Sequence, residues 1–145
     1  MIYSNLTRLA MNIAFKNHKD QVDKACTPYI FHPMYVAMQM TTEETVCVAL
    51  LHDVIEDSNM TISDLRNLNF PEPILEALSL MTHDKSVPYF DYIEKIKGNP
   101  IARQVKIADL KHNSDLSRLV GEPSAKDLER VKKYAKALSL LDAPA

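Results

Sequence analysis

Glycine is scarce in this chain of 145 residues, where it occurs only as Gly98 and Gly121. A β-sheet protein usually needs more glycine in its turns and more alternation of apolar and polar residues. The scarcity also excludes the glycine-rich loops of Rossmann and P-loop proteins, which hold phosphates with backbone N–H groups. Any phosphate chemistry in this chain must therefore use side chains and a metal ion.

Cysteine is equally scarce, with only Cys26 and Cys47. Two cysteines give neither a disulfide framework nor the paired spacing of a zinc site, so we expect a reducing, cytoplasmic location. We expect both thiols to be buried as small apolar side chains. No secretory signal opens the chain and no apolar run approaches the length of a membrane span, so we expect no membrane partner.

An excess of positive charge is also absent: there are 17 Lys and Arg residues against 19 Asp and Glu residues, a formal net charge of −2. A protein that binds nucleic acid without sequence preference normally has a basic surface, so we expect no nucleic-acid partner. The length and a hydrophobic content of 46% fit one globular domain over residues 1–145. The composition does not indicate an oligomeric state.

Apolar residues recur at helical spacing along nearly the whole chain, which predicts an all-α fold, a compact bundle of about seven to eight helices. The predicted helices cover residues 3–17, 33–40, 43–57, a short segment from 61, 71–83, 88–98, 100–119 and 124–140. Thr41 with Glu44 has the pattern of a capping box for the third of these helices. The charges of KDLERVKKYAK, residues 126–136, are predicted to form a solvated helix face.

The stretch ALLHDVIEDS, residues 49–58, places His52, Asp53, Glu56 and Asp57 in an otherwise apolar segment. On a helix these side chains lie on one side, and the like charges of Asp53 and Asp57, four residues apart, repel each other. A bound cation would offset that repulsion. Solvated acidic faces are not normally bracketed so closely by core residues, so the segment indicates a metal site.

Two more metal-ligand side chains lie in apolar helical context, His32 in YIFHPMYVA and Asp109 in VKIADLKHN. With His52 and Asp53 they form a mixed nitrogen and oxygen donor set, which suits manganese, iron or zinc. An ion in such a site polarises a phosphoryl group and lowers the pKa of bound water. The residue types therefore favour phosphate chemistry.

These signals also have simpler readings. His32 alone is compatible with a core or capping histidine, and Asp109 with a solvated carboxylate paired to Lys106 or Lys111. His18, which precedes a polar loop, is compatible with a pocket residue or with an ordinary surface histidine.

Three motifs occur in the order and spacing of a known family. PYIFHPMYVA, VALLHDVIEDS and VKIADLKHN resemble PYxxHPxxVA, AALLHDVxEDT and VKLADRLHN of the HD superfamily of metal-dependent phosphohydrolases. The resemblance is to the hydrolase domain of the RelA/SpoT alarmone enzymes and to the stand-alone small alarmone hydrolases, and it covers roughly two-thirds of the chain. One HD dipeptide is weak evidence, but three motifs together are specific, and they imply an HD-domain helical bundle.

The resemblance also implies roles for individual residues. A divalent metal, expected to be Mn²⁺, would be held by four ligands: His32, His52, Asp53 and Asp109. Glu56 and Asp57 match a Glu–Asp pair that orients or activates the attacking water, and a carboxylate one helical turn from a ligand is within reach of that role. Substrate contacts are expected from three residues: His18, Lys24 and Asn113.

The chain departs from the family in its base-binding residues. The family's loop HxGQxRKxGxPY reads HKDQVDKACTPY here, which puts Asp23 where an arginine stacks on guanine. A carboxylate cannot make that cation–π contact. Asp115 and Leu116 likewise stand in place of an arginine and a threonine. The metal and water residues therefore match the family, whereas the base-recognition residues are altered.

The predicted function is metal-dependent hydrolysis of a phosphate or pyrophosphate ester in a small phosphorylated nucleotide, with the 3′-pyrophosphate of (p)ppGpp as the first candidate. Another nucleotide phosphatase, acting on a 5′- or 2′-phosphomonoester, is the alternative that Asp23 favours. A non-catalytic nucleotide-sensing HD module is a third reading, although such modules normally lack some metal ligands. Basic groups at Lys24, Lys106, Lys111 or Arg118 are candidates to compensate the charge of the phosphates.

Overall fold

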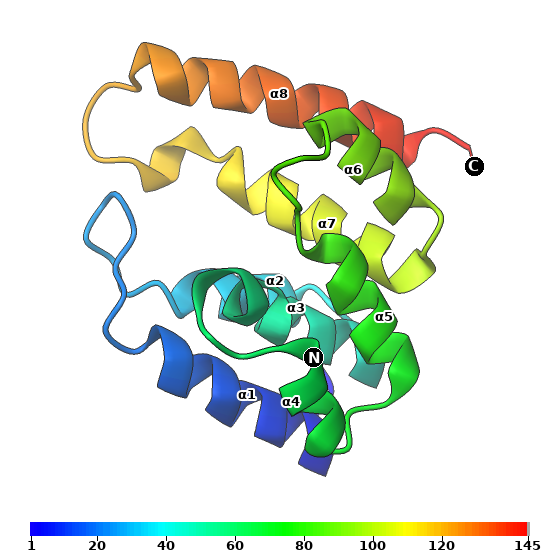
Figure 1. Ribbon diagram of the computed structural model, residues 1–145. Coiled ribbons are helices and arrows are strands. Elements are labelled where there is room, and N and C mark those ends of the chain that lie inside the picture. Colours follow the sequence, from blue (N-terminus) through cyan, green and yellow to red (C-terminus); the bar gives the residue numbers. More distant parts are fainter. Residues whose placement is uncertain (145) are drawn as a thin grey trace.

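The computed structural model describes residues 1–144, which form eight α-helices and one short 3₁₀ helix and no β-strand (Figure 1). The elements are α1 (Asn5–His18), α2 (Phe31–Met38), α3 (Glu43–Asp57), α4 (Ile62–Asn67), α5 (Glu72–Met81), α6 (Tyr89–Lys97), α7 (Pro100–Asn113), η1 (Leu116–Arg118) and α8 (Ala125–Asp142). The predicted all-α fold is confirmed. None of the described helices combines the length and the apolar character needed to cross a membrane.

Helix α3 lies at the centre of the molecule and packs against α1, α2, α5 and α7. Residues 45–52 of this helix are all buried. A helix that is apolar on all sides needs such surroundings, because it has no face to leave in water. His52 is the last residue of the buried stretch, so the His–Asp motif enters the core of the fold.

Helices α6, α7 and α8 pack against one another on one side of the molecule. In Figure 1, α8 runs along both α6 and α7. The loop between α1 and α2, residues 19–30, lies at the same end of the molecule as the segment between α7 and α8. This arrangement brings three regions that are distant in sequence to one edge of the bundle.

Hydrogen-bonding side chains begin several of the helices. Four helices start with a reciprocal capping box, formed by Ser4 with Thr7, Thr42 with Thr45, Thr61 with Asp64, and Ser124 with Asp127. The box predicted from Thr41 and Glu44 is wrong by one residue. Thr42 has the extended backbone of an N-cap, with φ −119° and ψ 156°, and its side chain accepts the N–H of Thr45.

Helix α7 ends at Asn113, earlier than the predicted end at residue 119. Ser114 Oγ donates to the Leu110 carbonyl at 2.7 Å, and Asp115 Oδ1 accepts the N–H of Ser117 at 3.0 Å. Short polar side chains compete for backbone groups in this way and favour turns over a continuing helix. The turn starts η1 and redirects the chain toward α8.

The two cysteines have different environments. Cys47 is buried in α3, as expected, but Cys26 is exposed in the α1–α2 loop, where its φ is 61°. The prediction that Cys26 is buried is therefore wrong. Asp23 holds this turn, because its Oδ1 accepts the N–H groups of Ala25 at 2.8 Å and Thr27 at 3.0 Å.

Candidate functional site

Three helices bring metal-ligand atoms together in the core. His32 lies in the first turn of α2, which begins earlier than predicted, while His52 lies in α3 and Asp109 in α7. One ligand atom from each lies within 4.8 Å of the others. Asp109 Oδ1 is 2.9 Å from His32 Nε2 and 3.5 Å from His52 Nε2. All three residues are buried, and we call them the His–His–Asp cluster.

Asp53, the fourth predicted ligand, lies beside the cluster. Its Oδ2 is 3.2 Å from His52 Nε2 and 3.7 Å from His32 Nε2. The same oxygen accepts a hydrogen bond of 2.7 Å from the Tyr29 hydroxyl. The four predicted ligands are thus neighbours, three of them in the compact cluster and Asp53 between the cluster and Tyr29.

The chemistry of the cluster fits a divalent cation. His52 Nδ1 donates to the Ala49 carbonyl at 2.6 Å, so Nε2 is the ring nitrogen that faces the cluster. This Nε2 is buried and forms no hydrogen bond, an arrangement that costs about 1–3 kcal/mol when nothing binds the atom. Burial lowers the pKa of His52, but the carboxylates of Asp53 and Asp109 outweigh burial and raise it to about 9. The position therefore favours positive charge, and imidazole with carboxylate suits a divalent ion.

His112 orients His32 and was not predicted to belong to the site. The Nδ1 atoms of the two rings are 2.7 Å apart, and the His112 ring stacks on Tyr35 at 4.0 Å between centroids. Burial, together with the charge of Arg118, lowers the pKa of His112 to about 4, and the two Nδ1 atoms are close enough for one ring to donate to the other. On the cluster side, His32 Nε2 is hydrogen-bonded to Asp109 Oδ1 at 2.9 Å, and a metal ion bound there would take the place of the shared proton. The sequence contained a signal for this position, because His112 follows Asp109 by three residues and therefore lies on the same face of the helix.

Asp109 is held by two neighbours on α7. Lys106 Nζ donates to its Oδ2 at 2.9 Å, and Asn113 Nδ2 donates to its Oδ1 at 3.0 Å. Burial opposes the charge of Asp109, but Lys106 and the histidine N–H groups hold its pKa well below the usual range. The ion pair with Lys106 is therefore present, whereas the solvated-carboxylate reading is wrong. Lys111 is exposed and lines a separate surface pocket.

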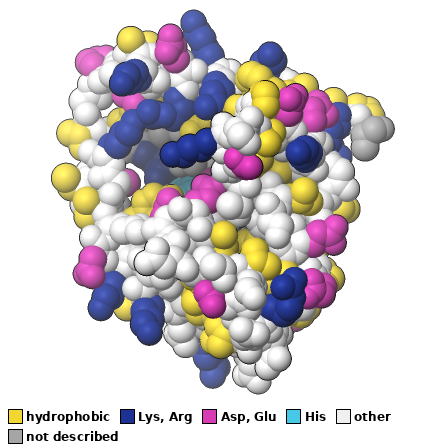
Figure 2. Space-filling model, in the orientation of Figure 1, with side chains coloured by type: hydrophobic (Ala, Val, Ile, Leu, Met, Phe, Trp, Pro, Cys, Tyr) yellow, Lys and Arg dark blue, Asp and Glu magenta, His cyan; other side chains and the backbone are white. Residues whose placement is uncertain are grey.

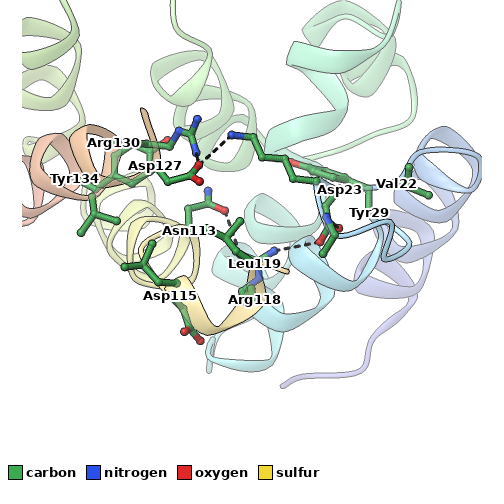
Figure 3. A pocket seen from close by; sticks show the side chains of 14 residues that line it. Val22, Asp23, Tyr29, Asn113, Asp115, Arg118, Leu119, Asp127, Arg130 and Tyr134 are labelled. Carbon is green, nitrogen blue, oxygen red and sulfur yellow. Dashed lines mark hydrogen bonds and ion pairs between the residues drawn. The ribbon is translucent and has the colours of Figure 1, made fainter. Parts of the chain in front are cut away.

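A cavity of about 430 Å³ lies where the α1–α2 loop faces α8 (Figure 3). Its walls come from the α1–α2 loop, the segment after α7, and α8, and we call it the α8 cavity. Tyr29 and Asn113 line it, and the same two side chains donate to Asp53 and Asp109. The cavity and the metal-ligand residues therefore share a wall.

Helix α8 contributes three polar side chains to the α8 cavity: Asp127, Arg130 and Tyr134. The other charged side chains of residues 126–136 are exposed, as predicted, whereas Asp127, Arg130 and Tyr134 are half-buried. Their spacing of three and four residues places them on one side of the helix, and that spacing was a signal for a shared partner. Nothing local in the sequence indicated that the partner is the α1–α2 loop.

Charged groups of both signs line the α8 cavity. Asp127 Oδ1 is 3.5 Å from Lys24 Nζ and 3.1 Å from Arg130 Nη1, while Asp23 Oδ2 is 3.9 Å from Arg118 Nη2. Figure 2 shows Lys and Arg side chains gathered around a hollow on this face of the molecule. The three cations that line the cavity, Lys24, Arg118 and Arg130, are each paired with one of its carboxylates.

Comparison with known proteins decides the family. No family model matches the chain. The guanosine-3′,5′-bis(diphosphate) 3′-pyrophosphohydrolase MESH1 of Danio rerio is 32% identical over 138 residues, and the alignment covers 86% of this chain and 75% of that protein. The Homo sapiens MESH1 is 32% identical over 139 residues, with 86% and 76% covered. The chain belongs to the MESH1 family of HD-type hydrolases.

Two further likenesses agree with the MESH1 family. The guanosine-3′,5′-bis(diphosphate) 3′-pyrophosphohydrolase of Aquifex aeolicus is 31% identical over 84 residues, which covers 55% of this chain and 12% of that protein. A solved structure described as a metazoan ortholog of SpoT that hydrolyzes ppGpp has a TM-score of 0.80 and 24% identity, covering 99% of this chain and 89% of that one. The structural likeness confirms the expected HD-type helical fold.

The Glu–Asp pair of the MESH1-type motif lies in the last turn of α3. Glu56 Oε1 accepts the backbone N–H of His83 at 3.0 Å, which ties the carboxylate to the segment after α5. Burial raises the pKa of both Glu56 and Asp57, with Asp53 adding to the effect. Among the described residues, neither carboxylate forms a hydrogen bond with the cluster. Both lie about one helical turn beyond the His–Asp motif.

The predicted substrate residues all lie near the shared wall. His18 is buried, with Nδ1 2.8 Å from Gln21 Oε1 and its ring centroid 5.1 Å from that of Tyr29. Its Nε2 is buried and forms no hydrogen bond, so the surface-histidine reading is wrong. Lys24 and Asn113 both line the α8 cavity. The structure thus brings the three residues to one region, although it leaves their roles as predictions.

Proposed function

We propose that the protein is a metal-dependent (p)ppGpp 3′-pyrophosphohydrolase that uses Mn²⁺. The observation that carries the proposal is the His–His–Asp cluster, whose ring nitrogens and buried carboxylate converge within 4.8 Å of one another. The α8 cavity's volume of about 430 Å³ lies within the range of small-molecule sites. The MESH1 relatives are named for this activity.

His32, His52, Asp53 and Asp109 are the residues that would hold the ion. When bound, the ion polarises a phosphoryl oxygen and lowers the pKa of water. The chain's own groups orient the ligands: the His112 ring is hydrogen-bonded to His32, the Ala49 carbonyl accepts from His52, and Lys106 donates to Asp109. These contacts aim the Nε2 atoms of both histidines at the cluster.

Glu56, with Asp57 beside it, would take the proton of the attacking water. The water oxygen forms a bond to the phosphorus that carries O3′, the P–O3′ bond breaks, and the proton taken by Glu56 passes to the departing O3′, so the products are pyrophosphate and a free 3′-hydroxyl. The hydrogen bond from His83 to Glu56 Oε1 leaves Oε2 available for the water. A carboxyl group whose pKa burial has raised is a stronger proton acceptor than an ordinary one.

The substrate's charge would be met in the α8 cavity. Lys24 and Arg130 share Asp127 as counter-ion, with separations of 3.5 and 3.1 Å, and Figure 3 shows Asp127 next to Arg130. A phosphate group would replace Asp127 as the partner of these cations. We assign His18 and Asn113 to the wall between phosphate and metal, because His18 lies next to Tyr29 and Asn113 next to Asp109.

The proposal also includes one domain over residues 1–145 and a cytoplasmic location. The buried apolar residues of the described chain form one hydrophobic core, which supports the single domain. Cys26 and Cys47 are both free thiols, which is compatible with a reducing compartment.

The test is product analysis with guanosine-3′,5′-bis(diphosphate) and the purified protein. We expect GDP and pyrophosphate in equal amounts, lost on chelation and restored by Mn²⁺. Asp53→Asn should lose turnover by at least about 100-fold, because metal-site residues act as a unit, while Asp84→Asn, which changes an exposed carboxylate outside the cluster, should not. Release of inorganic phosphate instead would indicate a phosphomonoesterase, and binding of Mn²⁺ and substrate without turnover would indicate a sensing module.

A further inference from the structure

The carboxylate of Asp23 has one engaged and one unengaged oxygen. Oδ1 accepts the N–H groups of Ala25 and Thr27 at 2.8 and 3.0 Å, which fixes the side chain in the turn of the α1–α2 loop. Oδ2 is 3.9 Å from Arg118 Nη2, which is beyond hydrogen-bonding distance. No group among the described residues donates a hydrogen bond to Oδ2. The α8 cavity is therefore lined by a fixed acceptor whose lone pairs are free.

Arg118 is likewise anchored away from this oxygen. Its Nη1 donates to the His112 carbonyl at 2.9 Å and to Asn113 Oδ1 at 3.3 Å, both at the end of α7. The guanidinium compensates the charge of Asp23 without occupying its acceptor sites. Its side chain and that of Asp23 are 26% and 22% exposed, so both remain accessible from the cavity.

We propose that Asp23 reads the base of the nucleotide and selects guanine, an inference that rests on the proposed function and names the specificity residue of the same site. A carboxylate oxygen only accepts hydrogen bonds. Guanine presents two adjacent donors on its Watson–Crick edge, N1–H and the 2-amino group. Adenine has no proton on N1 and no 2-amino group, so the lone pair of its N1 would face the lone pairs of Oδ2 and be repelled.

The surroundings of Asp23 suit a flat ring. The α8 cavity has apolar side chains on both the loop and the α7–α8 side, among them Val22, Leu116, Leu119 and Val131. Such walls bury the faces of a base while a few polar groups read its edge. The altered loop thus replaces stacking by an arginine with recognition of the base edge.

Binding of nucleoside diphosphates tests the inference without any need for turnover. GDP, IDP and ADP share their phosphates and differ on the base edge, since IDP keeps N1–H but lacks the 2-amino group. We expect calorimetry with Mn²⁺ to show GDP binding at least about 10-fold more tightly than ADP, with IDP between them. Asp23→Asn should weaken GDP binding by about 10–100-fold and change ADP binding less than threefold.

The asparagine variant isolates Oδ2. Its amide oxygen still accepts the N–H groups of Ala25 and Thr27, so the turn is kept, while the second oxygen becomes an NH₂ donor that opposes the donors of guanine. Asp84→Asn is the matched control, because Asp84 also accepts a backbone N–H in a turn, that of Ser86 at 2.9 Å, lies outside the α8 cavity, and undergoes the same charge change. It should keep the ratio of GDP to ADP affinity.

The outcomes separate the inference from the proposed function. Equal binding of GDP and ADP by the unaltered protein, or an equal loss for all three ligands in Asp23→Asn, would overturn the inference even if pyrophosphate is released from guanosine-3′,5′-bis(diphosphate). A guanine preference that Asp23→Asn abolishes and Asp84→Asn retains would establish it even if no turnover is found.

Discussion

Replacement of Lys106 by methionine tests whether the buried charge of Asp109 belongs to a metal site. The Lys106 side chain is 13% exposed and its Nζ lies 2.9 Å from Asp109 Oδ2. Methionine keeps most of the aliphatic length but removes the charge. In the metal-free protein, Asp109 then loses its main compensating cation while it remains buried.

The expected destabilisation can be worked from these contacts. Removing one partner of a buried ion pair costs about 3–5 kcal/mol. Asp109 keeps the hydrogen bond from Asn113 in this variant, so we expect a cost at the lower end of that range. About 3 kcal/mol corresponds to a fall in Tm of roughly 6–12 °C for a chain of this size. Up to about 1 kcal/mol of this loss comes from the Tyr92 ring, whose centroid lies 5.5 Å from Lys106 Nζ.

Mn²⁺ should restore most of this stability, because a bound cation compensates Asp109 in place of Lys106. With saturating Mn²⁺ we expect the loss to fall to about 1 kcal/mol, the part that comes from Tyr92. The difference of about 2 kcal/mol must appear in metal affinity by linkage, so Lys106→Met should bind Mn²⁺ about 30-fold more tightly.

Thermal unfolding with and without Mn²⁺, together with calorimetric titration of Mn²⁺, measures both quantities. Lys111→Met is the matched control, since Lys111 is an exposed residue of the same helix and should change Tm by less than about 2 °C. The same loss of Tm with and without the ion, or weaker Mn²⁺ binding by Lys106→Met, would refute the assignment of Asp109 to the metal site.

Two further predictions concern the water-activating residue and a helix cap. Glu56→Gln should lower kcat for pyrophosphate release by about 10²–10⁴-fold, because an amide cannot take a proton from water. Mn²⁺ binding should not change, since the amide oxygen still accepts the N–H of His83. A fall in kcat of less than threefold would contradict the proposed role of Glu56. Thr42→Ala should lower the free energy of unfolding by about 1 kcal/mol in urea titration, since it removes the acceptor of the Thr45 N–H. Thr41→Ala should change the free energy of unfolding very little. A larger loss in Thr41→Ala than in Thr42→Ala would indicate that Thr41 is the helix cap.

The helices were predictable because their signals are local. Apolar spacing and capping residues act within one or two turns, so α3 was predicted with its observed bounds, Glu43–Asp57. The end of α7 was missed although its cause is also local. Ser114 and Asp115 bind nearby backbone groups, and this competition outweighs the helical spacing of the apolar residues that follow.

The environments of single residues were harder to predict. His18 was compatible with the surface or a pocket, and only its packing against Tyr29 shows that it is buried. His112 belongs to a motif that is visible in the sequence, but its role depends on a contact with His32, a residue 80 positions away. The two readings of Asp109 as ion-pair partner and as cluster member turned out to be compatible, because its two oxygens meet different groups.

The sequence by itself determined the all-α class, the family and the four candidate ligands, because these depend on periodicity and on motifs read along the chain. The tertiary structure alone decided that α8 closes a cavity against the α1–α2 loop, and that Asp23 and Arg118, far apart in sequence, lie across it. The reason is physical: which faces of distant helices meet depends on packing in three dimensions, and amphipathic spacing shows that a face has a partner without showing which one.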